Sequence, residues 1–249
     1  MRSVVVVGLV ASAAAAIAGA MFTTNAQAAQ STIWAGYVAT PKTGVFNRIA
    51  ATWKQPRVSC AQAPAYEATF VGFDGYSGQS LEQAGVYAQC SGSSSTYYAF
   101  WDMYQSSAQN PTQSVFQVAP GDTITAIVSY VAPEFVLTVQ DKTTGQSFTQ
   151  DATCAGTCLR NSAEAIVEPL FNVSTQQNFP LANYGSTAFS AISMHDSHGK
   201  TGTFTNTNWT TTSLNQVSGG TTLQTVSALN KKTSSAAAGS RFTSTWHHA

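Results

Sequence analysis

The stretch TITAIVSYV, residues Thr123–Val131, decides the fold class. Ile124, Ala126 and Val128 alternate along it with hydroxyl-bearing or mixed positions, which is the period of an extended strand with one apolar face. Turn-forming residues bound it on both sides, in the segments APGD (119–122) and TTGQ (143–146). An apolar strand face must be covered, so the stretch predicts a strand of two packed sheets.

The chain from Ile33 onward repeats this pattern. Short β-branched and aromatic runs are separated by Gly, Ser, Asn and Pro, and hardly any stretch has helical spacing, so we predict an all-β fold, a sandwich or a barrel. The polar segments 201–208 and 231–240 are expected to be loops. The expected strands are Trp34–Ala39, Ile49–Trp53, Glu67–Phe73, Ser80–Tyr87, Thr96–Met103, Val115–Val118, Thr123–Val131, Glu134–Asp141, Gln146–Gln150, Ala163–Glu168, Ala188–His195, Trp209–Leu214, Thr222–Ala228 and Arg241–Trp246.

The first residues predict the compartment. Arg2 precedes an apolar run from Val4 to Phe22, and the small-residue pattern AQA (26–28) follows it, which is typical of a secretory signal peptide. We therefore expect residues 1–28 to be removed and residues 29–249 to form one secreted, extracellular domain with no membrane anchor. The alternative is an uncleaved anchor, because the run is nearly long enough to span a bilayer.

The composition argues against a nucleic-acid partner. Charged residues make up only 9% of the chain and the formal charges cancel. The adjacent pair Lys231 and Lys232 lies in a Ser/Thr-rich context and is most simply a solvated turn, and no basic stripe is present. So low a charge density suits a protein that stays folded in acid, because its net charge changes little with pH.

Four cysteines in an exported chain favour two disulfides. Three pairings are possible. We favour Cys60 with Cys90 and Cys154 with Cys158, because the second pair is separated by three residues and would close a tight hairpin tip. The rival is a four-cysteine zinc site, which lacks the usual C-x-x-C spacing.

The common hydrolase motifs are missing. No G-x-S-x-G motif supports a serine triad with His195 or His198, and the segment HDSH (195–198) has no further His or Cys nearby in sequence to complete a metal site, so we interpret it as a polar loop. An aspartic peptidase needs two Asp-containing loops that share a proton, but only Asp74-Gly75-Tyr76 comes near that pattern.

Four segments carry the remaining chemistry: FVGFDG (70–75), LEQAG (81–85), YYAFWDMY (97–104) and AEAIVE (163–168). In this order they resemble the glutamic peptidases, the eqolisin family of secreted acid endopeptidases. Three flanking segments strengthen the resemblance, which covers nearly all of the mature chain: IWAGYV (33–38), ATWKQP (51–56) and RFTSTW (241–246).

The resemblance implies an antiparallel β-sandwich of the concanavalin A-like or jelly-roll type, whose concave groove receives an extended polypeptide. It also implies a monomer that needs no metal or organic cofactor. The family's catalytic glutamate falls on Glu168 and its glutamine on Gln83. A carboxyl group with a pKa of about 4.3 is partly ionised in acid, so Glu168 can take a proton from water and return one to the leaving amine. The Gln83 amide then stabilises the oxyanion.

Further residues are expected around this pair. Alternation along AEAIVE puts Glu164 on the face of Glu168, where it would raise the pKa of Glu168 or act as a structural acceptor. Asp74 matches the family pattern and is a candidate supporting residue, and an Asp-Gly turn is the alternative interpretation of equal weight. Phe70, Ala165 and Phe100 stand where the family usually has Trp, and Tyr98 where it often has an acid. The expected supporting or groove residues are Asp74, Phe70, Glu164, Tyr98, Phe100 and Asp102.

A second function remains open from the sequence. A non-catalytic sandwich could bind carbohydrate or peptide through exposed aromatic side chains, for which Tyr76, Tyr97 and Trp101 are the candidates.

Overall fold

The computed structural model describes residues 28–61, 64–77, 80–105, 113–172, 175 and 177–248. The predicted signal peptide therefore lies outside the described residues, except for its last residue, Ala28. Within the described ranges the secondary structure is entirely β, and no helix there is long and apolar enough to cross a membrane.

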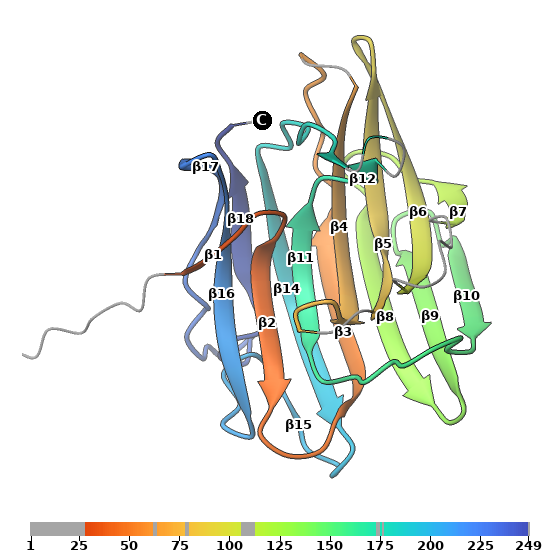
Figure 1. Cartoon of the computed structure of the whole chain (residues 1–249), viewed down its shortest axis with the longest axis vertical. Coiled ribbons are helices and arrows are strands. Elements are labelled where there is room, and N and C mark those ends of the chain that lie inside the picture. The colour runs from red at the N-terminus through yellow and green to blue at the C-terminus, as the bar shows by residue number, and fades with distance from the viewer. Residues whose placement is uncertain are drawn as a thin grey trace, which may run out of the picture.

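The described residues form strands that are stacked in two layers (Figure 1). They are β1 (Ala29–Ser31), β2 (Ala35–Pro41), β3 (Phe46–Lys54), β4 (Ala65–Asp74), β5 (Ser80–Ser91), β6 (Ser94–Gln105), β7 (Gln113–Gln117), β8 (Thr123–Val131), β9 (Glu134–Asp141), β10 (Ser147–Ala152), β11 (Ala163–Glu168), β12 (Phe171–Asn172), β13 (Gln177–Asn178), β14 (Ser186–Asp196), β15 (Thr201–Gly202), β16 (Trp209–Ser218), β17 (Thr221–Val226) and β18 (Phe242–Trp246).

One long sheet folds back on itself to make both layers. Its strand order is β10-β9-β8-β3-β14-β18-β17-β16-β2-β11-β4-β5-β6-β7, with antiparallel neighbours throughout, while β1 adds to β16 in parallel. Strand β14 joins the layers: Ser186–Phe189 pair with β18, and Ser190–Asp196 pair with β3. At this change of partner Ala191 has a positive φ of 50°, which fits the irregular register there.

The apolar core lies between the two layers. Ile124, Ala126 and Val128 of β8 are fully buried in it, as the alternation of the stretch predicted, and they share one cluster with Val71 and Phe73 of β4. The all-β sandwich prediction is thus confirmed. Each expected strand is present, most of them longer by a few residues, whereas β1, β12, β13 and β15 were not predicted and β15 lies in an expected loop.

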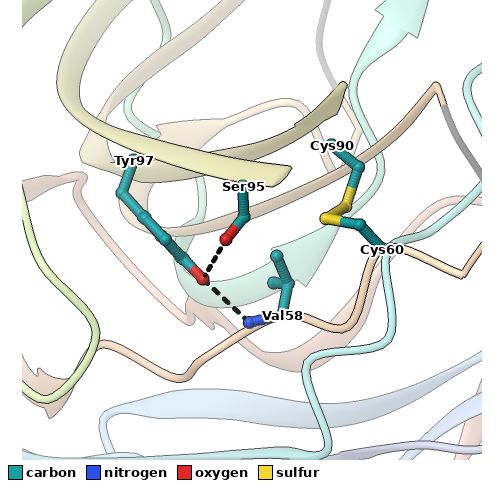
Figure 2. The surroundings of a disulfide bond; sticks show 5 residues. All are labelled: Val58, Cys60, Cys90, Ser95 and Tyr97. Atoms are coloured by element: carbon teal, nitrogen blue, oxygen red, sulfur yellow. Dashed lines mark hydrogen bonds between the residues drawn. A yellow bond between two sulfur atoms is a disulfide. The ribbon is translucent and has the colours of Figure 1, made fainter. Parts of the chain in front are cut away.

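Both predicted disulfides are present. Cys60–Cys90 ties the segment after β3 to the end of β5, and Figure 2 shows that Tyr97 secures the same segment, because its hydroxyl accepts hydrogen bonds from the Val58 amide (2.9 Å) and Ser95 Oγ (3.1 Å). Cys154–Cys158 closes a short loop between β10 and β11. These two strands are not paired, so the expected hairpin tip is wrong although the pairing is right.

Loss of the two disulfides is expected to have unequal effects on stability. Cys60–Cys90 closes a loop with a sequence separation of 30, against 4 for Cys154–Cys158. Because the restriction of the unfolded chain grows with loop length, replacing the first pair with Ser should cost about 3 kcal/mol and replacing the second pair clearly less. Urea unfolding of the two double-Ser variants at about pH 4 measures this, and equal losses would contradict it.

Candidate active site

Four strands place the predicted catalytic segments side by side. Strand pairing aligns Glu164 of β11 with Gly72 of β4, Gly72 with Gln83 of β5, and Gln83 with Asp102 of β6. Residues directly opposite each other in an antiparallel sheet point to the same face. The sequence segments AEAIVE, FVGFDG, LEQAG and YYAFWDMY therefore contribute one polar row to one face.

The absence of a side chain at Gly72 gives this row its shape. A Cβ at that position would lie 3.0 Å from Glu164 Oε1, so the Glu164 carboxyl extends over Gly72 toward β5. Glu164 is fully buried, and Gln83 and Asp102 are nearly so. Gln83 Oε1 is buried and accepts no hydrogen bond from the described residues.

Glu168 lies on the same face, four residues further along β11. It pairs with Ala68, and the row continues through Tyr87 and Tyr98. Its partly exposed side chain accepts a 2.6 Å hydrogen bond from Trp34 Nε1 at Oε2. Glu168 and Gln83 thus share a face, but their rows lie four residues apart along the strands, and Glu164 is the glutamate in register with Gln83.

Apolar side chains form the floor around these polar groups. Phe70 and Phe100 are buried on the same face, and the Trp34 indole meets the Phe70 ring edge-on with centroids 6.4 Å apart. Tyr87 contacts both Tyr98 and Phe100. The buried cluster consists of Trp34, Val38, Ala68, Phe70, Phe100, Ile166 and Leu214.

Burial determines the protonation of the two glutamates. It raises the pKa of Glu168 to about 8, with a further rise from the charge of Asp102, while the Trp34 hydrogen bond lowers it. Burial also raises the pKa of Glu164 well above its usual range, and the charges of Asp74, Glu82 and Glu168 add to this. The two glutamates are coupled through their charges, but this coupling raises the pKa of Glu164, while the added rise at Glu168 comes from Asp102.

Asp74 supports the site from one end. Its carboxylate accepts hydrogen bonds from the backbone amides of Arg160 and Asn161, both at 2.8 Å, and from Ser80 Oγ at 3.3 Å. Asp74 itself has a positive φ of 67°. It therefore fixes the loop that leads into β11 and influences Glu164 through its charge.

Glu82 faces away from this site. It pairs with Phe73 and Met103, which belong to the core between the layers, and it is fully buried there. Burial raises the pKa of Glu82 to about 9. In the motif LEQAG only Gln83, and not Glu82, is therefore available to the site.

The aromatic residues of the alternative binding function are placed differently from what we expected. Tyr97 is only 4% exposed and holds the core segment beside Cys60–Cys90, and Trp101 packs against the core. Tyr76, at 40%, is exposed. The set was expected to be exposed together and is not, because Tyr97 points to the core face of β6.

A cavity of about 600 Å³ lies elsewhere, where β3, β14 and β18 meet, and its lining includes Thr52, Ser190 and Arg241. It contains neither Gln83 nor Glu168. The substrate groove at the candidate site therefore stays a prediction. Among the described residues, no three His, Cys, Asp or Glu side chains are placed to hold a metal ion, and independence of metals and organic cofactors also stays a prediction.

Sequence reasoning did not assign a site role to Trp34. The segment IWAGYV was noted only for its resemblance, and nothing in it indicates a hydrogen-bond partner 134 positions away.

The architecture and these residues together define a β-sandwich that carries a carboxyl group and an amide on one sheet face. The model of the Peptidase A4 family matches residues 32–238. The chain therefore belongs to the Peptidase A4 family and is a glutamic endopeptidase, as the motifs predicted.

Solved structures share the fold. Scytalido-glutamic peptidase with a peptide-based transition-state analogue has a TM-score of 0.71 at 18% identity, covering 87% of this chain and 98% of that chain. The eqolisin SCP-B, in complex with the tripeptide Ala-Ile-His, has a TM-score of 0.68 at 18% identity, with the same coverage of both chains. Aspergilloglutamic peptidase from Aspergillus niger has a TM-score of 0.61 at 22% identity, covering 73% of this chain and 99% of that chain. No curated protein sequence matches the chain.

Proposed function

We propose that the protein is a secreted acid endopeptidase in which Glu168 and Gln83 act together on an extended polypeptide. The observation that carries this proposal is the common face of the two side chains, with one Glu168 oxygen held by Trp34. The transition-state analogue and the tripeptide bound to the similar structures support a peptide substrate. Two disulfides support an extracellular location. We also expect residues 29–249 to act as one domain and as a monomer.

Trp34 determines where the proton of Glu168 lies. The indole N–H can only donate, so Glu168 Oε2 accepts, and this contact favours Oε1 as the position of the proton in the neutral acid. With a pKa of about 8, Glu168 is protonated in acid, whereas its ordinary pKa had led us to expect partial ionisation. Glu168 therefore begins the reaction as a general acid.

The hydrolysis then proceeds in two proton-balanced steps. In the first, Glu168 Oε1–H gives its proton to the oxygen of the scissile carbonyl while water attacks the carbon, and the resulting carboxylate takes a proton from that water. In the second, Glu168 protonates the leaving nitrogen, the C–N bond breaks, and a hydroxyl of the intermediate returns a proton to Glu168. The side chain ends as it began.

Gln83 supplies the hydrogen bonds that Glu168 cannot. Its amide N–H donates to the carbonyl oxygen and polarises the carbonyl group while that oxygen receives the proton from Glu168, and its buried Oε1 is free to accept from the attacking water. An amide does not titrate in acid, so this contribution is constant over the working pH range.

Gln83→Ala is expected to lower kcat by about 10²–10³-fold at about pH 4, because one donor aimed at the reacting carbonyl oxygen contributes about that much. The assay is cleavage of an acid-denatured protein by the purified mature chain. The control is Gln89→Ala, on the same strand but opposite Tyr66 and Thr96, which should retain activity. Equal activity of both variants, or no cleavage by the wild type between about pH 2 and pH 6, would overturn the proposal.

A further inference from the structure

A buried glutamine on β17 lies behind the candidate site. Gln224 is fully buried, and its Oε1 accepts a 2.6 Å hydrogen bond from the Tyr184 hydroxyl. Its Nε2 donates to the Val167 carbonyl oxygen at 3.2 Å and also to Gln216 Oε1. Both polar ends of the amide are therefore used, and these contacts fix which end is which.

The Val167 contact holds the backbone that presents Glu168. Val167 pairs with Ala35, the first residue of β2, and the ladder between β2 and β11 ends there. Glu168 has a strand partner on one side only, Ala68 of β4. A carbonyl next to the end of a ladder is held less firmly than one inside it, so the added bond from Gln224 matters at this position.

A second hydrogen bond of this glutamine pair, the Thr32 arm of the network, reaches the segment that carries Trp34. Gln216, which is 2% exposed, donates from Nε2 to the Thr32 carbonyl oxygen at 3.2 Å. Thr32 precedes Trp34 by two residues, and the Trp34 amide is fixed by Ser31 Oγ at 3.0 Å. The same glutamine pair therefore contacts the backbone on both sides of the Trp34–Glu168 hydrogen bond.

The hydrogen-bond network that contains Gln216 and Gln224 is also anchored at its other end. The Tyr184 hydroxyl makes a 2.8 Å hydrogen bond with Ser244 Oγ of β18, and both side chains are buried. The hydrogen-bond network Ser244–Tyr184–Gln224–Gln216 consists of uncharged hydroxyl and amide groups. Because none of them titrates in acid, its geometry does not change there.

We propose that Gln224 and Gln216 are positioning residues of the catalytic reaction, which fix the distance between Trp34 and Glu168 from the core side of the sheet. This inference rests on the proposed role of Glu168. Neither glutamine touches the reacting atoms. They act through Val167 and Thr32, and so keep Glu168 Oε2 on the indole and Oε1–H directed at the substrate. Positioning of this kind affects the transition state more than substrate binding.

Gln224→Leu is expected to lower kcat at about pH 4 by about tenfold, with KM within about twofold of the wild-type value. The affinity for a peptide-based transition-state analogue should fall in parallel with kcat. Gln224→Glu should recover most of the loss, because a neutral carboxylic acid in acid still accepts from Tyr184 and donates one hydrogen bond. The control is Gln55→Leu, an equally buried glutamine bonded to Trp53 and Glu67 away from the site, for which kcat should not change.

If Gln224→Leu does not fold, Gln216→Leu tests the Thr32 arm alone, with a smaller loss of kcat expected. Equal kcat losses in Gln224→Leu and Gln55→Leu, or a loss that Gln224→Glu does not recover, would show that the network is only structural. Activity that survives in Glu168→Gln would instead refute the proposed function, so the two failures are distinguishable.

Discussion

Glu168→Gln is expected to abolish peptide hydrolysis, with kcat at about pH 4 falling by about 10³-fold or more. Glutamine has the size of glutamic acid and can still accept the Trp34 hydrogen bond through its Oε1, so the fold and KM should be retained. It has no acidic proton to give to the carbonyl oxygen or to the leaving amine, and loss of general acid–base catalysis typically costs about 10²–10⁴-fold.

The matched control for this variant is Glu82→Gln. It is the same chemical change at a fully buried glutamate, adjacent to Gln83 in sequence but directed to the core between the layers. It should keep near wild-type kcat at about pH 4, where its pKa of about 9 keeps the wild-type side chain neutral too. Equal losses in both variants would remove Glu168 from the mechanism.

The second large effect concerns pH and stability. Burial raises the pKa of Glu67 to about 7, of Glu168 to about 8 and of Glu82 to about 9. All three pKa values are higher than in the unfolded chain. The contribution of each carboxyl group to the free energy of unfolding is therefore full below about pH 4.5 and is lost as the pH rises through the pKa of the folded state. The loss at Glu67 alone lowers the free energy of unfolding by on the order of 3 kcal/mol. We expect the protein to be most stable in acid and to unfold between about pH 6 and pH 9.

Urea unfolding at one-unit steps from about pH 3 to pH 9 measures this dependence. In Glu82→Gln the decline should be shallower, because one carboxyl that resists ionisation has been replaced by a neutral amide. Stability that is constant or increases toward neutral pH would contradict the prediction. The activity and stability tests are independent, since Glu82→Gln should change the second and not the first.

The sequence predicted the fold well where strands have a periodic face. Thr123–Val131 and Ala163–Glu168 have the predicted bounds. Strand β12 (Phe171–Asn172) and strand β15 (Thr201–Gly202) were missed, because two-residue strands have no alternation and are defined by partners that only the folded chain supplies. The Cys154–Cys158 loop was paired correctly but misplaced on a hairpin for the same reason.

The identities of the candidate site residues could be predicted from the sequence, but their surroundings in the fold could not. Alternation alone placed Glu164 and Glu168 on one face, and pairing with β4 and β5 brought Gln83 to it. The role of Trp34 could not be predicted, because its hydrogen bond joins residues 134 positions apart. The pKa of Glu168 was also out of reach, since burial depends on strands distant in sequence. Gln224 lies in a polar strand where sequence offers no sign of chemistry.

Strand β14, which belongs to both layers, has a consequence for a peptidase that is surrounded by copies of itself. Its first residues pair with β18 and its later residues with β3, so neither layer can separate from the other without breaking one continuous strand. A peptidase that binds extended polypeptide needs a chain segment free of pairing partners. Strands inside the sheet lose their partners only when the molecule unfolds, so the shared strand is expected to limit self-digestion of the folded protein.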